Sequence, residues 1–508
     1  MNKRTFYKNT AIMTGCSLLL RLFGILFRIF ISNRVGAEGM GLYQLVFSVY
    51  VLGTTFANSG IVTAVTCIAA EHFAQGNYTA VTRLMRLCSM ISLLIGGASS
   101  LILFTGAPLI GQWIGDDRAV PAIAICGVAL PFIGVAGCMK GYFLARRQAW
   151  PPCLAQIIEQ IVRIVGILIM LEWFWNGDLT EACAIIVLGD ALAESASCVY
   201  LLCVYRKHRP PKAEHRSPPV PLVKPLLHIA LPLTGGRYLS TALRTAENIL
   251  VPAQLTAYNG SDALSLSQFG AVKAMALPLI FFPSALLMTV SGLLIPELSD
   301  AHALGQRRQI SRLVELSLKI TLLGAVLIGG LFTVLGKSLG SLLYNDSLVG
   351  FLLQILGPLT PMMYLDSVAT AMLRGLGQQV HSLWYTVIDS VIRITLILIL
   401  LPRFGLMGFL FVMLVSNVLT GLLSTHRLLT VSNATVQWGR WVILPTLSAS
   451  VAGAVCTLMP LKNTAYVIAG GLVFTAIYGA LIILLKCFDK NDLRQLKSRK
   501  TQTKAAVD

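Results

Sequence analysis

Long apolar segments recur along the whole chain and constrain its fold more than any other feature. Each is about as long as the 17 to 25 residues that a helix needs to cross roughly 30 Å of hydrocarbon. The predicted spans are 9–31, 41–68, 86–108, 119–143, 153–173, 180–205, 226–254, 265–295, 312–336, 350–373, 382–402, 405–426, 441–460 and 464–486. We therefore predict an all-α integral membrane protein with about fourteen transmembrane helices.

The composition agrees with lipid as the solvent for this chain. Hydrophobic residues make up 56% of its 508 residues and charged residues only 12%. Soluble chains carry about 25% charged residues, so this one could not form an ordinary polar surface. No segment is left over for a soluble domain.

The net charge of +18 would suggest a nucleic-acid partner in a soluble chain, but its distribution excludes that interpretation. With a cytoplasmic N-terminus, basic residues gather in the inner segments, above all in 206–224 and 490–504. The outer connections hold only Arg34, Arg118, Lys337, Arg403 and Lys462. This asymmetry follows the positive-inside rule. It predicts that both termini are cytoplasmic, as an even number of spans also requires.

The chain contains an internal repeat at a shift of 229 or 230 residues. The segment 158–164 matches 388–394 with acid and arginine at the same spacing, Gly76 matches Gly305, and Asp117 matches Asp346. Each repeat holds six helices, so the two are expected to be parallel. The predicted organisation is a lobe at 1–205, a basic, proline-rich cytoplasmic linker at 206–225, a second lobe at 226–428, and helices thirteen and fourteen with a basic tail at 429–508.

Charged residues inside predicted spans need a physical reason, because an ionisable group in hydrocarbon costs several kcal/mol. Glu159 with Arg163, and Asp389 with Arg393, stand four residues apart with the acid first, which favours an intrahelical ion pair. These pairs could stabilise each helical bundle or take part in coupling. A further group of acids could form a proton or sodium site or balance the two arginines. It consists of Asp190, Glu194 and Asp366.

A second set of intramembrane charges is mainly cationic. It comprises Arg21, Arg28, Arg237, Arg244 and Lys273, accompanied by Glu247. A spacing of seven residues places Arg21 and Arg28 on one helix face, and likewise Arg237 and Arg244. Snorkelling to an interface suits Arg28 and Lys273. The other cations lie too far from the ends of their spans for this. We predict that the whole set, Arg28, Lys273 and Glu247 included, forms the site that binds an anionic substrate.

Residues that would indicate an enzyme or a metal site are missing from the pattern. The seven His residues show no metal-ligand spacing, and the eleven Cys residues form no CxxC pair. The segment 330–338 differs from a phosphate-binding loop because its glycines are one residue too far apart. We expect a transporter without a metal or organic cofactor.

Several motifs resemble the stage V sporulation protein B group of polysaccharide-biosynthesis membrane proteins. They are 21–24 (RLFG), 35–43 (VGAEGMGLY), 141–143 (GYF), 156–163 (QIIEQIVR), 282–284 (FPS) and 295–297 (IPE). This group is similar to the lipid II flippase MurJ within the multidrug/oligosaccharidyl-lipid/polysaccharide exporter superfamily. The resemblance covers nearly the whole chain and implies a bacterial cytoplasmic-membrane protein.

The resemblance implies flipping of an undecaprenyl-diphosphate-linked precursor of the cell envelope, with lipid II for peptidoglycan or spore cortex as the preferred cargo. Helices one, two, seven and eight would line a cationic cavity for the diphosphate-sugar head group. Arg21 matches an arginine of the flippase in an Arg-x-x-Gly context. Asp389 is the one residue that carries over to that family's sodium site, so Na⁺, H⁺ and the membrane potential are the candidate driving forces.

Other functions remain open at this point. A flippase for teichoic-acid or exopolysaccharide units would present the same diphosphate. A multidrug or cation antiporter of the same superfamily would need acids facing the substrate, and the excess of cations argues against it. A non-transporting scaffold for envelope synthesis is a third class. The expected partners are the lipid-linked sugar and membrane lipids, with other envelope-synthesis proteins as candidates.

Overall fold

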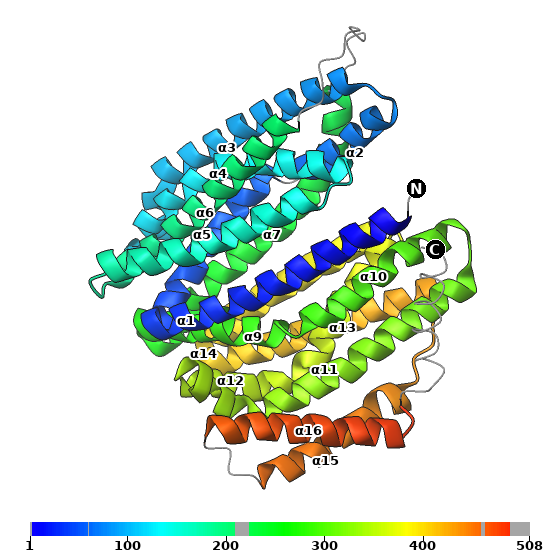
Figure 1. Ribbon diagram of the computed structural model, residues 1–508. Helices are drawn as coiled ribbons and strands as arrows, with labels where there is room; N and C mark the ends of the chain where they lie inside the picture. The colour runs from blue at the N-terminus through cyan, green and yellow to red at the C-terminus, as the bar shows by residue number, and fades with distance from the viewer. Residues whose placement is uncertain (1–2, 59, 209–222, 459–462, 488–508) are drawn as a thin grey trace. The chain divides into compact units, whose positions relative to one another are not determined.

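The computed structural model describes residues 3–58, 60–208, 223–458 and 463–487, and all regular structure in these ranges is helical (Figure 1). The helices up to the linker are α1 (Lys3–Asn58), α2 (Ile61–Ala74), α3 (Tyr78–Ile114), η1 (Asp117–Ala119), α4 (Val120–Ala145), α5 (Trp150–Phe174) and α6 (Leu179–Lys207). Those after it are α7 (Val223–Asn259), α8 (Asp262–Gly270), η2 (Ala271–Ala276), α9 (Leu277–Phe281), α10 (Ser284–Ala303), α11 (Arg307–Tyr344), α12 (Ser347–Leu356), η3 (Gly357–Leu359), α13 (Thr360–Gly375), α14 (Gln379–Ser432), η4 (Gly439–Ile443), α15 (Leu444–Thr457) and α16 (Thr464–Leu484). Most of the predicted linker, 209–222, lies outside the described residues.

The chain packs as two compact units. Unit 1 comprises Met1–Phe27, Glu38–Ala253 and Ser265–Ser267, and unit 2 comprises Arg28–Ala37, Gln254–Leu264 and Gln268–Asp508. These units group residues by packing, whereas the predicted lobes group them by sequence repeat. The lobe boundaries therefore stay a prediction.

Eleven helical segments among the described residues are long and apolar enough to cross a membrane. Helices α1 and α14 each join two predicted spans, because Gly36 (φ 77°) and Gly405 (φ 54°) break the helical backbone inside them. At these left-handed φ values a glycine avoids the steric penalty of a β-carbon. The 37-residue α7 is long enough to span but is less apolar. The all-α membrane fold is confirmed, and the count of fourteen stays a prediction.

The predicted eighth span, 265–295, is not one continuous α-helix. A π-helical turn, η2, follows α8, and the chain turns at Phe282 and Pro283 before α10 begins at Ser284. The hydropathy pattern missed these breaks because the residues around them, apart from Lys273, are apolar. Pro283 lacks a backbone N–H and cannot continue the helical hydrogen bonds through this position.

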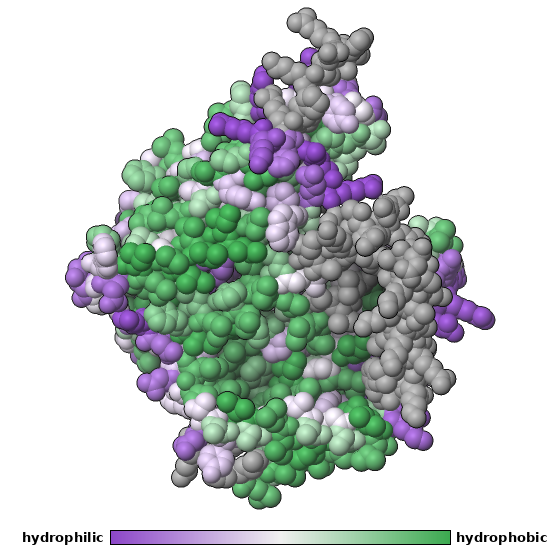
Figure 2. Space-filling model, viewed as in Figure 1, coloured by the Kyte–Doolittle hydropathy of each residue, from purple (hydrophilic) through white to green (hydrophobic). Residues whose placement is uncertain are grey.

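The surface of the described residues is unusually apolar. Large side chains such as Trp113 (72% exposed), Trp173 (78%) and Leu472 (68%) stand at the surface. On the face shown in Figure 2, apolar side chains cover most of the described surface. Water would oppose such exposure, whereas lipid tails accept it. These side chains form the lipid-facing surface of the helices.

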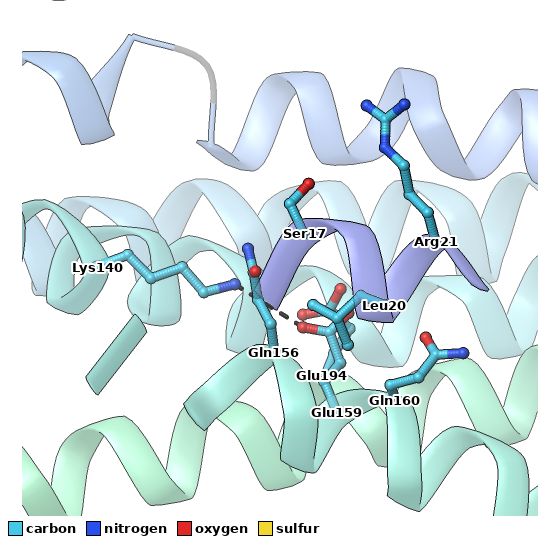
Figure 3. Close-up of a pocket in the computed structure, with 8 residues that line it drawn as sticks. All are labelled: Ser17, Leu20, Arg21, Lys140, Gln156, Glu159, Gln160 and Glu194. Carbon is cyan, nitrogen blue, oxygen red and sulfur yellow. Dashed lines mark ion pairs between the residues drawn. The ribbon is translucent and has the colours of Figure 1, made fainter. Parts of the chain in front are cut away.

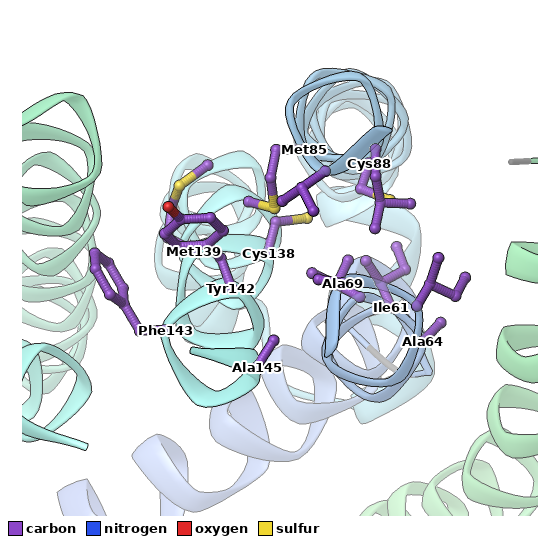
Figure 4. Close-up of a cluster of buried hydrophobic side chains, with 14 of the residues drawn as sticks. Ile61, Ala64, Ala69, Met85, Cys88, Cys138, Met139, Tyr142, Phe143 and Ala145 are labelled. Carbon is purple, nitrogen blue, oxygen red and sulfur yellow. The ribbon is translucent and has the colours of Figure 1, made fainter. Parts of the chain in front are cut away.

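Each unit has its own packed core. In unit 1, side chains of α2, α3 and α4 point toward one another in Figure 4, with Met85 on α3 and Tyr142 on α4 nearly fully buried. In unit 2, one cluster joins α10, α11 and α13. A further cluster packs α15 and α16 on α11, where the Tyr478 hydroxyl donates to the Leu323 carbonyl (2.8 Å).

Local geometry recurs between the two repeats and refines their alignment. The left-handed residue that ends α3 is Gly115, and its counterpart at the end of α11 is Asn345. The following Asp116 and Asp346 each accept a hydrogen bond from the backbone N–H two residues on, at 3.0 and 2.8 Å. The predicted match of Asp117 with Asp346 is therefore wrong by one residue. Helix α11 is one residue longer than α3, which changes the shift from 229 to 230 at this turn.

Candidate functional site

Arg163 on α5 is the centre of an ion-pair network in unit 1. Its Nη2 lies 3.0 Å from Glu159 Oε1 on the same helix, and its Nε lies 2.7 Å from Asp190 Oδ1 on α6. The other oxygen of Asp190 accepts a hydrogen bond from the Tyr43 hydroxyl (3.1 Å). All four side chains are largely shielded from the surface. Because two carboxylates share one guanidinium, the network ties α1, α5 and α6 together.

A pocket of about 330 Å³ lies beside this network, within unit 1 (Figure 3). It is lined by Ser17, Leu20 and Arg21 of α1, Lys140 of α4, Gln156, Glu159 and Gln160 of α5, and Glu194 of α6. The Lys140 Nζ lies 3.8 Å from Glu159 Oε2. Four helices thus bring seven polar side chains to one place in an apolar bundle. Such a concentration of polar groups in a membrane segment is typical of a functional site.

Arg21 stands at the edge of the pocket and is exposed. In Figure 3 its guanidinium points away from the carboxylates of Glu159 and Glu194. Among the described residues it forms no hydrogen bond or ion pair. Its charge therefore remains available for a ligand.

Helix α7 adds two more exposed arginines to unit 1. Thr245 and Asn248 hydrogen-bond to Ser48, which fixes the face of α7 that packs on α1. Arg237 and Arg244 are exposed, and neither guanidinium has a hydrogen bond or ion pair with a described residue.

Glu247 is the acid that the sequence places beside these arginines. Its side chain is only 2% exposed, so it differs sharply in environment from the two exposed guanidinium groups. Arg237 and Arg244, the positive charges that α7 places at its surface, thus have no acidic partner among the described residues.

The remaining two predicted cations belong to unit 2. Arg28 Nη1 donates a long hydrogen bond (3.5 Å) to the carbonyl of Ala274 in η2. In the same π-helical turn, the Lys273 Nζ lies 5.9 Å from the centre of the Phe409 ring, a distance suited to a cation–π interaction. Both side chains thus have protein contacts, in contrast to Arg21.

The acids of unit 2 are hydrogen-bonded to serines. Ser416 donates to Asp389 Oδ1 at 2.6 Å, and Ser424 donates to Asp366 Oδ1 at 2.8 Å. The second predicted pair is looser than the first, because Arg393 Nη1 lies 3.8 Å from Asp389 Oδ2. Whether these acids serve coupling stays a prediction. Among the described residues no group of three His, Cys, Asp or Glu side chains is placed to hold a metal ion.

Sequence reasoning missed several members of these networks. Lys140 lies inside a predicted span and could have been singled out as an intramembrane charge. Tyr43, Gln156 and Gln160 lie in the motifs 35–43 and 156–163 that carry the family resemblance, but that resemblance implied no role for these three residues. Sequence reasoning also missed an ion cluster outside the pocket. In it Arg118 forms ion pairs with Glu38 (2.8 Å) and Asp116 (2.9 Å).

A family model described as polysaccharide biosynthesis protein matches residues 6–302. Stage V sporulation protein B of Bacillus subtilis (strain 168) is 24% identical over 98% of both chains. The lipid II flippase MurJ of the same organism is 21% identical, over 77% of this chain and 76% of the relative.

Solved structures show the same fold. A structure of the lipid II flippase MurJ in an inward closed conformation matches 94% of this chain and 98% of its own, with a TM-score of 0.71 and 13% identity. An inward-facing multidrug resistance transporter of the MATE family matches 82% of this chain and 96% of its own, with a TM-score of 0.65 and 15% identity.

Proposed function

Because the chain belongs to the polysaccharide biosynthesis protein family, we propose that it is a flippase for an undecaprenyl-diphosphate-linked sugar precursor of the cell envelope. The preferred cargo is lipid II for peptidoglycan or spore cortex, and transport proceeds by alternating access in the cytoplasmic membrane. The names of its relatives support this class, since one is a lipid II flippase and another a sporulation protein.

The observation that carries the proposal is the set of exposed arginines in unit 1. Arg21, Arg237 and Arg244 lie on membrane helices and have no acidic partner among the described residues. A lipid diphosphate brings about two negative charges, and a guanidinium can hold two phosphate oxygens with parallel, charge-assisted hydrogen bonds. Such bonds are stronger where water is scarce. An anionic head group fits this set, whereas an organic cation would be repelled.

The sugar and the driving force are separate questions. Teichoic-acid and exopolysaccharide precursors present the same diphosphate to the arginines and are the main alternative cargoes. A multidrug antiporter is the second alternative, because the MATE family shares the fold. For coupling, Asp389 is the candidate residue for Na⁺ or H⁺, and the membrane potential could also drive an anionic substrate.

The test measures binding and flipping by the full chain in lipid vesicles, with lipid II as the probe. We expect Arg21→Ala and Arg244→Ala each to abolish or severely reduce flipping at matched amounts of inserted protein. Arg21→Lys should restore little, because lysine lacks the planar, two-pronged donor geometry of arginine. Arg86→Ala, which removes an exposed arginine on α3 outside the pocket, is the matched control.

Salt gives a second readout of the same contact. Residual lipid II binding by Arg21→Ala should depend less on ionic strength, because one charge contact has been removed. Wild-type flipping in both alanine variants would refute the cationic substrate site. If the wild-type protein bound neither lipid II nor other lipid diphosphates but bound organic cations, the antiporter alternative would be correct.

A further inference from the structure

The pocket of unit 1 contains polar groups that neither the ion-pair network nor phosphate binding uses. Glu194 and Gln156 have no hydrogen bond or ion pair with a described residue. The side-chain oxygen of Gln160 accepts from Arg163 Nη1 (3.1 Å), which leaves the amide NH₂ of Gln160 to donate elsewhere. Gln156 is exposed and Glu194 and Gln160 are half-buried, and all three line a pocket inside an apolar bundle, so these side chains point to a ligand with both donors and acceptors.

The charges of the lining exclude a strongly charged ligand inside the pocket. Inside the pocket, Lys140 is positive and Glu159 and Glu194 are negative, and Glu159 is also paired with Arg163. Arg21 stands at the edge with its guanidinium turned away from the carboxylates. The two carboxylates would repel a phosphate placed among them, and Lys140 would repel an organic cation. A neutral ligand that is rich in hydroxyl groups suits this balance, because each hydroxyl both donates and accepts.

The second repeat shows that these glutamines are not required by the fold. At the shift of 230 residues, Gln156 and Gln160 correspond to Thr386 and Ser390. The hydroxyls of this threonine and serine donate to backbone carbonyls of their own helix, at 3.0 and 2.9 Å. The longer polar side chains thus occur in the first repeat, where they line the pocket.

The ion-pair network around Arg163 also fixes one wall of the pocket. Glu159 is fixed by Arg163, and Arg163 by Asp190, so the α5 wall cannot easily change its position relative to α6. The volume of about 330 Å³ is at the small end of the usual range for ligand sites, about 300–1,000 Å³. It offers room for one sugar ring and not for a complete oligosaccharide.

We propose that this pocket binds the sugar that is attached directly to the diphosphate, with Gln156, Gln160 and Glu194 contacting its hydroxyl or acetamido groups. Arg21 at the edge of the pocket holds the adjoining phosphate. The proposal rests on the proposed flippase function and adds a site that distinguishes sugar-bearing lipid from the bare carrier. Recognition of the first sugar would thus occur within unit 1.

The test compares two probes that differ only in the sugar: undecaprenyl diphosphate, and the same lipid bearing one acetamido sugar. The affinity of each probe for the full chain is measured in lipid nanodiscs. The ratio of the two affinities reports on the sugar alone, because a change in diphosphate binding affects both probes equally. Gln156→Leu keeps the volume but removes the amide, and Glu194→Ala removes the free carboxylate. Gln112→Ala, at an exposed glutamine of α3, is the matched control.

We expect wild type and the control to prefer the sugar-bearing lipid, and the pocket variants to lose about tenfold of this preference, as for one or two lost hydrogen bonds. Their affinity for undecaprenyl diphosphate should not fall, because this probe lacks the sugar. Arg21→Ala should weaken both probes by the same factor. An unchanged ratio in both pocket variants, or an equal loss of both probes, would overturn the sugar site while leaving the flippase standing. Failure of wild type to bind either probe would instead refute the proposed function.

Discussion

At the scale of single residues, the intramembrane charges fall into two classes with different physical roles. Arg163 is surrounded by carboxylates at 2.7 and 3.0 Å, so its charge is neutralised within the protein. Arg21 and Arg244 have no such neighbour among the described residues. A charge that the protein compensates stabilises the fold, whereas a charge left uncompensated in a membrane protein points to a ligand.

We expect Glu159→Gln to destabilise the protein more than it impairs transport per inserted molecule. The change leaves Lys140 and Arg163 with less negative charge in a shielded site, at a cost of about 1–3 kcal/mol. Arg163→Met should cost more, because it leaves two carboxylates uncompensated. Thermal unfolding in detergent gives the stability, with Glu172→Gln, an exposed acid on the same helix, as the control. Lost transport at undiminished stability would assign Glu159 to coupling instead.

At the scale of helices, the first connection is a single residue. Gly36 (φ 77°) turns the chain between the two halves of α1, and no atom lies within 4 Å of the place where a β-carbon would stand. Just beyond the turn, Glu38 is held by Arg118, which is itself held by Asp116. The position of Gly36 is therefore constrained by its backbone conformation and not by neighbouring atoms, and the ion cluster holds the residue just beyond it.

Gly36→Ala tests how much the stability of the protein depends on the backbone conformation at this turn. The substituent meets no neighbour, so the left-handed φ alone should lower stability by about 1–2 kcal/mol. Gly166→Ala is the matched control, since that position in α5 is equally open but helical, and there alanine should be neutral or stabilising. Thermal unfolding of both variants provides the comparison. Equal stability of the two would show that the turn tolerates a β-carbon.

At the scale of the whole molecule, the protein is a multi-pass membrane protein of the MATE/MurJ fold. The matching turns after α3 and α11 support its internal repeat. Its orientation in the membrane stays a prediction from charge, which places the segments rich in basic residues on the cytoplasmic side.

The orientation can be tested by labelling single cysteines with a membrane-impermeant reagent. The exposed Cys67 and Cys203 are first replaced by serine. Cysteines introduced in the 206–224 linker and in the C-terminal tail should react only from the cytoplasmic side, and one at Asn259 only from outside. An externally labelled linker would contradict both the fourteen-span count and the parallel repeat.

The sequence by itself determined the features that depend on local spacing or on composition. Hydropathy gave the membrane helices, and a four-residue spacing was enough to predict the contact of Glu159 with Arg163, because residues one helical turn apart meet wherever the helix packs. The pocket was decided only by tertiary structure. Arg21, Lys140 and Glu194 are far apart in sequence and come together because α1, α4, α5 and α6 pack in one unit. No spacing rule links residues on different helices, so their meeting depends on how the apolar faces of those helices fit together.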